Sequence, residues 1–302
     1  MAVVLYENFR ALFYAPFYAA HAIGAYAAEG ADVTLCASPD PASTAVALRA
    51  GAADVMWGGP LRVLLIHAKD PASDVVCFCD VVQRDPFFIV GGTAKPDFQL
   101  GDLLGQRFAS VAEVPTPWLC LQDDLRRAGL DPAALSRLSG PSMADNAAAL
   151  RAGTLDAVQL FQPHAEALLA SGAGHLWYAA ASRGLTAYTA LVTRRAVIAA
   201  RREELLAMVR AMRRTLHWIA ATSAADIAHA LRDFFPDIPP DLFAAAIARY
   251  QALDLYAADP LMPRAGFARL QAAMRSGGAL SRDIAFEDCV DTSLAQRNVA
   301  PA

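Results

Sequence analysis

The residues best suited to chemistry in this chain are polar and aromatic side chains that follow short apolar runs. Asn8, Phe9, Arg10 and Tyr14 come directly after the apolar run 3–6. An amide offers a donor and an acceptor together, and an aromatic ring can stack on a flat molecule. This combination suits non-covalent binding of a small organic compound, although Phe9 and Tyr14 could instead only cover the end of a sheet.

A second group of candidates ends the apolar run 55–57. It consists of Trp57, Gly58 and Gly59, with Pro60 directly after them. Paired glycines let backbone N–H groups approach a ligand closely, and a helix that begins after them favours an anion or an oxygen acceptor. Because tight turns need glycine in any case, a purely structural reason for the pair stays open.

A third group lies further along the chain. Glu113, Thr116 and Trp118 surround the start of a predicted helix, while Gln162 and Tyr188 lie at two further apolar runs. A carboxylate beside an indole suits an aminated aromatic ring, whereas Thr116 is explained equally well as a helix N-cap. We expect one flat ligand to lie between the loop Asn8–Tyr14 and the segment Glu113–Trp118, with Trp57–Gly59 as its floor.

The sequence has none of the arrangements that are typical of enzymes. It contains no nucleophile elbow, no His-Glu-x-x-His motif, no phosphate-binding loop and no acid pair placed for general acid–base catalysis. Its five cysteines lack the spacing of a metal site. Cys77 and Cys79 lie two apart on a predicted strand, so we expect buried, reduced thiols on one face. We expect no metal and no cofactor.

Length and composition restrict the class of protein. A chain of 302 residues that is 56% hydrophobic can form two cores. A net charge of -4 without a basic block argues against nucleic-acid binding. No uncharged apolar run reaches about 18 residues, so no membrane span is expected. The start lacks the basic region of a secretion signal, which predicts a cytoplasmic protein as written, or a periplasmic one if a leader was removed. We expect a monomer.

Two series of alternating strands and helices position these candidates. The first series has predicted strands at 3–6, 33–36 and 55–57 and predicted helices at 14–28, 42–50 and 60–68. The second has strands at 108–111 and 157–160 and helices at 118–128, 143–151 and 163–170. From 201 to about 274 the pattern is almost wholly helical. Such alternation predicts parallel sheets with helices on both faces.

The two series read as separate lobes of an α/β protein, joined by extended crossings near 88–92 and 186–190. The first lobe would comprise residues 1–88 and 187–302, including the C-terminal helices, and the second lobe would be an insertion of residues 89–186. Ligands of doubly wound sheets bind outside the carboxyl ends of the strands. Two such sheets facing each other would therefore bring all three candidate groups to one interlobe cleft.

Several motifs in this order and spacing carry a family resemblance. They are Asn8-Phe9, YAPFYAA at 14–20, EGADV at 29–33, LRAGAADV at 48–55, its echo LRAGTLDA at 150–157, and LLGQR at 103–107. The sequence thereby resembles the substrate-binding proteins of the thiamine-precursor, aliphatic-sulfonate and nitrate ABC transporters, a family that includes thiamine-pyrimidine synthases. The resemblance covers residues 3 to about 220. It implies a two-lobed, type 2 periplasmic-binding-protein fold whose closing cleft usually serves the permease of an ABC importer.

The sequence departs from the synthases of that family at their reactive groups. Those enzymes consume a lysine-bound cofactor and a histidine just after the third strand, where this chain has Gly58 and Arg62. Their cysteine-rich cluster is also missing. We therefore expect a binding protein without catalytic residues, for a thiamine-pyrimidine-like or other heteroaromatic or amide compound. Two alternatives stay open: an aliphatic sulfonate or oxyanion ligand, which Arg10 and Arg62 would suit, and a cytoplasmic enzyme or ligand sensor with this fold.

Overall fold

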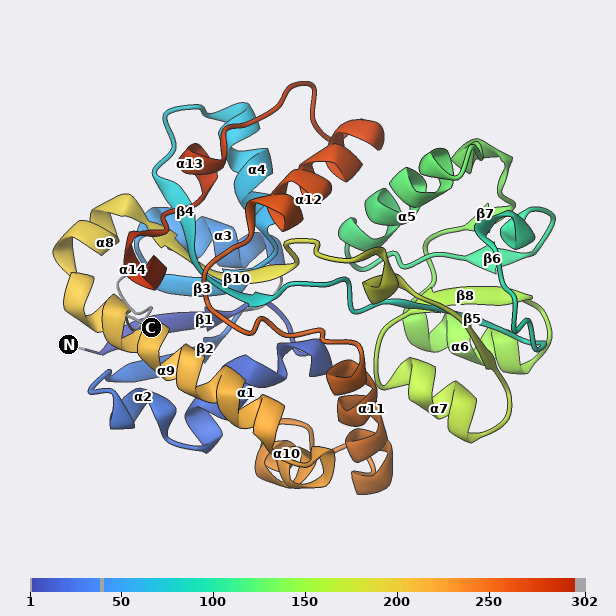
Figure 1. Ribbon diagram of the computed structural model, residues 1–302, viewed down its shortest axis with the longest axis horizontal. Coiled ribbons are helices and arrows are strands. Elements are labelled where there is room, and N and C mark those ends of the chain that lie inside the picture. The colour runs from blue at the N-terminus through green and yellow to red at the C-terminus, as the bar shows by residue number, and fades with distance from the viewer. Residues whose placement is uncertain (1, 39–40, 297–302) are drawn as a thin grey trace.

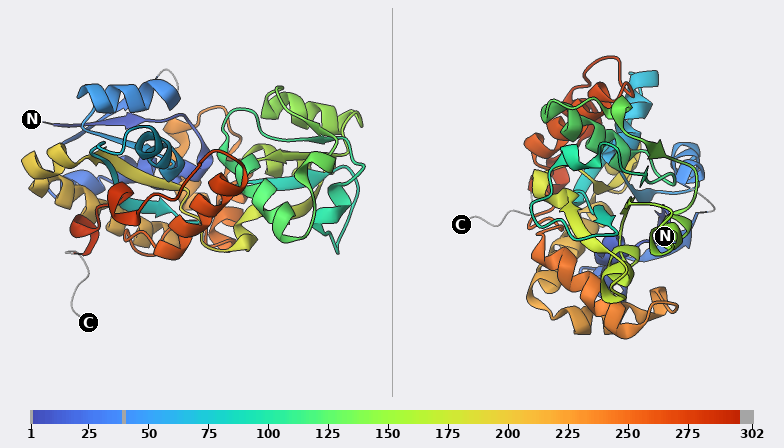
Figure 2. Two further views of the ribbon diagram at one scale, coloured as in Figure 1. Left: turned by 90° about the horizontal axis from the view of Figure 1, so that it is seen from above. Right: turned by 90° about the vertical axis from the view of Figure 1, so that its right-hand side faces the viewer.

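The structure is a computed structural model and describes residues 2–38 and 41–296. Its elements form two lobes that lie in a row along the longest axis of the molecule (Figures 1 and 2). Each lobe is built around a sheet of five strands. Within the described residues, no helix is long and apolar enough to cross a membrane. The two-lobed α/β architecture expected from the motifs is confirmed.

The sheet of the first lobe has the order β2-β1-β3-β10-β4. Its strands are β1 (Val3–Glu7), β2 (Val33–Ala37), β3 (Val55–Gly58), β4 (Val75–Val82) and β10 (Thr189–Arg194). The strands β1, β2 and β3 are parallel, whereas β10 is antiparallel to both of its neighbours. The sheet is therefore mixed and not purely parallel as predicted, because β10 enters it from the second lobe.

Helices cover both faces of this sheet (Figure 1). One face carries α1 (Ala15–Ala22), α2 (Ala25–Ala28), α9 (Arg202–Ala221), α10 (Ala224–Leu231) and α11 (Pro240–Ala252), with the turns η1 (Leu12–Tyr14) and η5 (Arg232–Phe234). The other carries α3 (Pro41–Ala50), α4 (Pro60–Lys69), α12 (Arg264–Ser276) and α13 (Phe286–Cys289). The single helix predicted over 14–28 is wrong, because Gly24 adopts a left-handed φ of 67° that separates α1 from α2.

The sheet of the second lobe has the order β7-β6-β8-β5-β9. Its strands are β5 (Phe88–Gly91), β6 (Phe108–Ala109), β7 (Arg137–Leu138), β8 (Ala157–Leu160) and β9 (His175–Ala179). The helix α5 (Thr116–Arg127) packs on one face, while α6 (Met143–Arg151) and α7 (His164–Ala170) pack on the other. The short turns η2 (Leu100–Leu103), η3 (Pro132–Ala134) and η4 (Ala180–Arg183) complete the lobe.

The two crossings between the lobes run side by side. The backbone N–H of Thr186 donates to the carbonyl of Gln83 at 2.8 Å, and that of Tyr188 donates to Val82 at 3.0 Å. The strands β2 and β6 lie in different sheets, in keeping with two separate units. The proposed boundaries of the lobes, at 88/89 and 186/187, stay a prediction.

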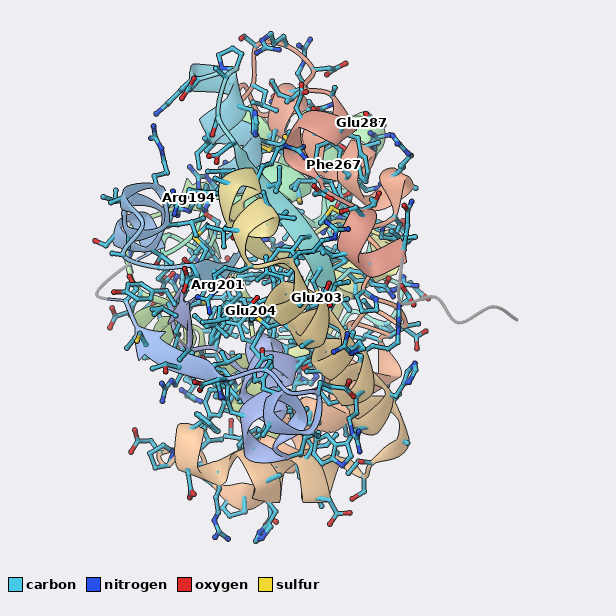
Figure 3. The ribbon with its side chains drawn as sticks, turned by 90° about the vertical axis from the view of Figure 1, so that its left-hand side faces the viewer. Arg194, Arg201, Glu203, Glu204, Phe267 and Glu287 are labelled. Atoms are coloured by element: carbon cyan, nitrogen blue, oxygen red, sulfur yellow. The ribbon has the colours of Figure 1, made fainter. Side chains whose placement is uncertain are left out.

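The end of the first lobe is closed by polar contacts between distant segments. Figure 3 looks onto this end, where α9 begins below the short helix α8 (Arg195–Ala200) and near α14 (Ser293–Gln296). Arg201 pairs with Asp54 at 2.8 Å and with Glu204 at 3.4 Å. The pair with Asp54 fastens the start of α9 to the loop that leads into β3, and so helps to fix the sheet that carries the candidate site.

The two central cysteines are buried as expected, but they do not share a face. Cys77 is 0% and Cys79 is 1% exposed, and both are free thiols. A register shift opposite Leu191 and Val192 turns the strand between them. Cys77 therefore packs with the cluster that contains α4, and Cys79 with the cluster that contains α9. Burial raises the pKa of both thiols well above the usual value, so they stay protonated at neutral pH.

Candidate functional site

A cavity of about 50 Å³ lies between the two lobes, and we call it the interlobe cavity. The first lobe contributes the loop after β1, the start of α4 and the end of a crossing, while the second lobe contributes the start of α5. The lining residues are Asn8, Phe9, Phe13, Tyr14, Gly59, Leu61, Arg62, Val114, Pro115, Thr116 and Tyr188. The carboxyl ends of β1 and β3 thus reach this cavity, as the topology of such sheets requires.

Half of the twelve residues expected at the site line this cavity. They come from four segments that are far apart in the sequence: Asn8, Phe9 and Tyr14 from the first, Gly59 from the second, Thr116 from the third and Tyr188 from the fourth. Their convergence agrees with the expected position of the site, while their contact with a ligand stays a prediction.

Two tyrosines are among the residues that line the cavity. The Asn8 side-chain amide donates to the hydroxyl of Tyr14 at 3.2 Å. The hydroxyl of Tyr188 is buried and has no hydrogen-bond partner among the described residues. Burial raises the pKa of both tyrosines, so both remain neutral phenols at physiological pH. Because an unpaired buried hydroxyl is costly, a ligand oxygen that reaches Tyr188 would gain a favourable contact.

The wall of the first lobe is made rigid by aromatic packing. The ring of Phe9 meets that of Tyr14 edge-on at 5.2 Å, and Phe13 lies 4.2 Å from Tyr14 and 6.0 Å from Tyr188. Such tilted and edge-to-face arrangements are favourable for aromatic rings. The polar atoms of the wall are therefore carried by side chains whose positions are fixed by their neighbours.

The electrostatic character of the cavity favours a negatively charged group. Arg62 lines it from the first turn of α4, and α5 begins at Thr116. Burial raises the pKa of Tyr14, and the hydrogen bond from Asn8 and the charge of Arg62 partly oppose this rise. Among the described residues that line the cavity, none is an aspartate or a glutamate. Helix N-termini and a guanidinium both attract anions.

Three expected residues of the first lobe lie outside the cavity. Trp57 is fully buried and stacks on Phe17 at 4.8 Å, so it supports the wall from behind instead of forming a floor. Gly58, the last residue of β3, is not among the residues that line the cavity. The Arg10 guanidinium donates twice to the carboxylate of Glu7, at 3.0 and 2.8 Å, and Arg10 does not line the cavity.

Three expected residues of the second lobe also have other partners. The Glu113 carboxylate accepts the backbone N–H of Met143 at 2.8 Å and so binds the start of α6. One face of Trp118 lies under the guanidinium of Arg137 at 4.2 Å. Gln162 is fully buried, and its side chain exchanges two hydrogen bonds with Glu166, at 2.9 and 3.2 Å.

Sequence reasoning left out five residues that line the cavity. Phe13, Leu61, Val114 and Pro115 are neighbours of expected residues, and Arg62 was considered only as a reason to keep an anionic ligand open. All five lie in segments that follow strands, and this position is the one sign of them in the sequence. A position after a strand predicts which segments meet, but not which of their side chains face the cavity.

Direct contacts hold the lobes together around the cavity. The Arg249 guanidinium on α11 donates to the Glu166 carboxylate on α7 at 2.5 and 2.9 Å. The backbone N–H of Gln162 donates to the hydroxyl of Tyr250, also on α11, at 3.1 Å. The cavity has room for about one or two water molecules, whereas ligand pockets commonly measure about 300–1,000 Å³. The structure thus presents a closed arrangement, and a ligand could enter only if the lobes moved apart.

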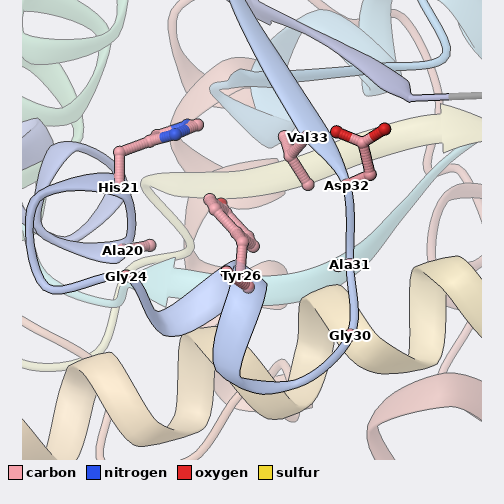
Figure 4. Close-up of a pocket in the computed structure, with 9 residues that line it drawn as sticks. Ala20, His21, Gly24, Tyr26, Gly30, Ala31, Asp32 and Val33 are labelled. Atoms are coloured by element: carbon pink, nitrogen blue, oxygen red, sulfur yellow. The ribbon is translucent and has the colours of Figure 1, made fainter.

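A larger cavity in the first lobe contains none of the expected residues. It measures about 430 Å³ and lies between α1, α2 and the start of β2, where the rings of His21 and Tyr26 meet at 4.8 Å (Figure 4). It is formed at the amino end of β2, opposite to the strand ends where ligands of these sheets bind. The interlobe cavity is therefore the better candidate.

Known proteins share both the sequence pattern and the fold. The model of the NMT1-like family matches residues 9–231. The putative binding protein YtlA of Bacillus subtilis (strain 168) is 26% identical over 293 residues, which cover 96% of this chain and 88% of that protein.

Two solved structures of sulfonate-binding proteins are similar in fold. The alkanesulfonate-binding protein SsuA from Xanthomonas axonopodis pv. citri, bound to MOPS, has a TM-score of 0.72 at 18% identity, with 97% of this chain and 98% of that chain covered. The aliphatic sulphonate binding protein SsuA from Escherichia coli has a TM-score of 0.75 at 16% identity, with 96% of both chains covered. The family model spans most of the sequence, and the chain therefore belongs to the NMT1-like family.

Proposed function

We propose that this protein is a solute-binding protein that holds a small organic anion, a sulfonate or a carboxylate, in the interlobe cavity and serves the permease of an ABC importer. Family membership and the two-lobed fold support the binding role. The anionic ligand class is proposed from the positive charge of the residues that line the interlobe cavity. Arg62 and the start of α5 face a cavity whose described lining residues include no acid.

The anionic group would lie near Arg62, Tyr14 and Tyr188. The two phenols and the guanidinium are all donors in the states that burial and charge favour, and a sulfonate or carboxylate consists of acceptors. Asn8 can donate or accept and would orient a second polar group of the ligand. Phe9 offers an apolar contact to the body of the ligand. The solved sulfonate-binding protein that holds MOPS supports this class of ligand.

A neutral heteroaromatic or amide compound is the second candidate. Asn8 and the aromatic rings favour it, because an amide can pair with a heteroaromatic edge and rings can stack on its face. The amino group of a thiamine pyrimidine would need a nearby carboxylate, but Glu113 already accepts from the backbone of Met143. This candidate therefore ranks below the anion.

Binding without catalysis agrees with the chemistry of the lining residues. The polar side chains are an amide, two phenols, a hydroxyl and a guanidinium. A phenol whose pKa is raised by burial is a poor general base at neutral pH. Nothing in this set resembles an activated nucleophile with its base.

A thermal-shift screen separates the two ligand classes. Ethanesulfonate and 4-amino-5-hydroxymethyl-2-methylpyrimidine would be tested on the wild type, Arg62→Met, and the control Arg214→Met at an exposed position of α9. A ligand that binds the folded state raises the melting temperature. We expect a shift with ethanesulfonate that Arg62→Met removes and Arg214→Met keeps. A shift with the pyrimidine alone, unaffected by Arg62→Met, would establish the second candidate instead.

A further inference from the structure

A second cavity lies where the crossings leave the first lobe, and we call it the hinge cavity. Its volume is about 520 Å³, within the range of ligand pockets. It shares no lining residue with the interlobe cavity. It is lined by the first crossing, by the end of α9 and by the end of α11 with the loop after it. The lining residues are Gln83, Arg84, Leu216, His217, Ile219, Ala220, Gln251 and residues 254–258.

The wall of the hinge cavity is fastened to both crossings. The backbone N–H of Gln83 donates to Leu255 at 3.1 Å, and its side-chain amide donates to the carbonyl of Tyr256 at 3.1 Å. The carbonyl of Gln83 accepts from Thr186 of the other crossing at 2.8 Å. Asp254, with a left-handed φ of 48°, turns the chain sharply at the end of α11. The cavity is thus a built feature of the hinge and not a gap between loose loops.

Arg84 in this wall pairs with no carboxylate in the part of the chain that the structure describes. It is half-buried, its Nη1 donates to the carbonyl of Ala181 at 3.2 Å, and its buried Nε has no partner among the described residues. The carboxylate of the next residue, Asp85, is taken by Arg183 at 2.5 Å. Withdrawing a cation from water is unfavourable unless a negative group compensates it. An anion bound in the cavity would supply that compensation.

Tyr256, which also lines the cavity, carries a second donor. The hydroxyl of Tyr256 is buried and has no partner among the described residues, and burial raises the pKa of this phenol. It therefore stays protonated and can donate to an acceptor. The remaining wall includes the apolar side chains of Leu216, Ile219 and Leu255. The charged side chain of Asp254 and the ring of His217 belong to exposed residues, at the rim.

We propose that the hinge cavity is a second binding site, which takes a small organic acid with an apolar body, such as an aromatic or short aliphatic carboxylate. The carboxylate accepts from Arg84 and Tyr256, and the apolar body packs against the end of α9. The site is independent of the ligand in the interlobe cavity, because the two cavities have no residue in common.

Benzoate is a suitable probe, because it combines a carboxylate with a compact apolar ring. It would be titrated by isothermal calorimetry into the full chain, into Arg84→Met and Tyr256→Phe, and into the controls Arg62→Met in the interlobe cavity and Arg214→Met on the surface. We expect one benzoate in the hinge cavity of each chain. Arg84→Met should weaken it at least about tenfold and Tyr256→Phe about threefold, as loss of a charged and a neutral hydrogen bond predicts. Arg214→Met should bind benzoate as the wild type does, and Arg62→Met should keep the binding that Arg84→Met weakens.

Three results would overturn the proposal: no binding at millimolar benzoate, equal affinity in Arg84→Met, or loss of binding in Arg62→Met. The last would place benzoate in the interlobe cavity, and it would leave the proposed function intact. If Arg84→Met does not fold, Ala220→Trp gives the same answer. Ala220 is an exposed helical residue on the cavity wall, so an indole there fills the space without entering the core. Benzoate that binds this variant at full affinity would also contradict the site.

Discussion

The two walls of the interlobe cavity are held in place by different forces. The wall of the first lobe rests on buried rings, with Trp57 stacked on Phe17 at 4.8 Å behind it. The wall of the second lobe is the start of α5, and this helix is held by Arg183, which binds Asp124 and Asp85 at 2.5 Å each. One wall is therefore fixed by packing, and the other by a buried network of charges.

The walls also differ in what they offer a ligand. The first lobe supplies the amide of Asn8, the phenols of Tyr14 and Tyr188 and the guanidinium of Arg62, whereas the second lobe supplies Thr116 and apolar neighbours. Recognition of polar groups is thus concentrated in the first lobe. The second lobe mainly covers the ligand, and changes to its wall should affect stability and closure more than specificity.

The largest expected effect comes from removing the packing behind the first wall. Trp57→Ala should lower the free energy of unfolding by about 3–5 kcal/mol, because it leaves a cavity in a close-packed core. Urea denaturation measures this loss. The matched control is Trp118→Ala. Its indole is half-buried under Arg137, and losing it should lower the free energy of unfolding by about 1 kcal/mol. Equal losses in the two variants would remove the distinction between the walls.

Breaking the charge network behind the second wall should have the next largest effect. Arg183→Met leaves Asp85 and Asp124 without their shared cation, and the expected loss of unfolding free energy is about 3 kcal/mol. Arg127→Met is the control, since its exposed guanidinium pairs with Asp123 and should contribute at most about 1 kcal/mol. If both variants lose the same amount in urea denaturation, the network does not hold α5.

A buried acid that pairs with no cation among the described residues should make the stability of the protein depend on pH. Asp80 is 0% exposed, and neither carboxylate oxygen has a partner among the described residues. Burial raises its pKa, so it holds its proton in the folded state, while the unfolded chain releases it above about pH 4. Unfolding then releases a proton, and stability should fall as pH rises, by at most about 1.4 kcal/mol per pH unit.

The variant Asp80→Asn tests this pH dependence. An amide cannot ionise, so the stability of the variant should fall less steeply than that of the wild type between pH 5 and pH 8. The two slopes should differ by at most about 1.4 kcal/mol per pH unit. Urea denaturation at several pH values measures both slopes. Parallel curves for the two proteins would mean that Asp80 is ionised in the folded state. Asp241→Asn, at an exposed position on α11, should reproduce the wild-type slope.

The smallest effect is expected from the polar side chain of the second wall. Thr116 lies at the start of α5, whose N-cap position is occupied by Pro115 without a side-chain hydrogen bond. Thr116→Ala should therefore change ligand affinity by less than about threefold, the value of one neutral hydrogen bond. Tyr188→Phe, which removes the unpaired hydroxyl of the first wall, should weaken binding more. The reverse order, measured by calorimetry, would move recognition to the second lobe.

The sequence predicts the fold better than it predicts the site. Alternating runs and their glycine ends place β1, β3 and α6 almost to the residue, because buried strands and capped helices have strong local signals. The short β7 has only two residues, both exposed, and so has no such signal. The register shift between Cys77 and Cys79 is set by the partner strand β10, which no local pattern reveals.

For the site, strand ends predict which loops meet but not which side chains turn inward. Asn8 and Tyr188 were predicted because they follow or precede strands, and they line the cavity. Glu113 and Gln162 have the same kind of position, yet each is used by a neighbouring helix, through Met143 and Glu166 respectively. Those competing partners come from tertiary contacts and local turns, which sequence spacing does not resolve.

Calorimetric titration of ethanesulfonate into the wild type and into Arg62→Met tests the central claim most directly. The account predicts one site per chain in the wild type and an affinity at least about tenfold lower in Arg62→Met, because the variant removes a charge-assisted contact and keeps the aromatic wall. Arg214→Met should match the wild type. Equal binding in Arg62→Met, or no heat of binding with any small sulfonate or carboxylate, would contradict an anion site between the lobes.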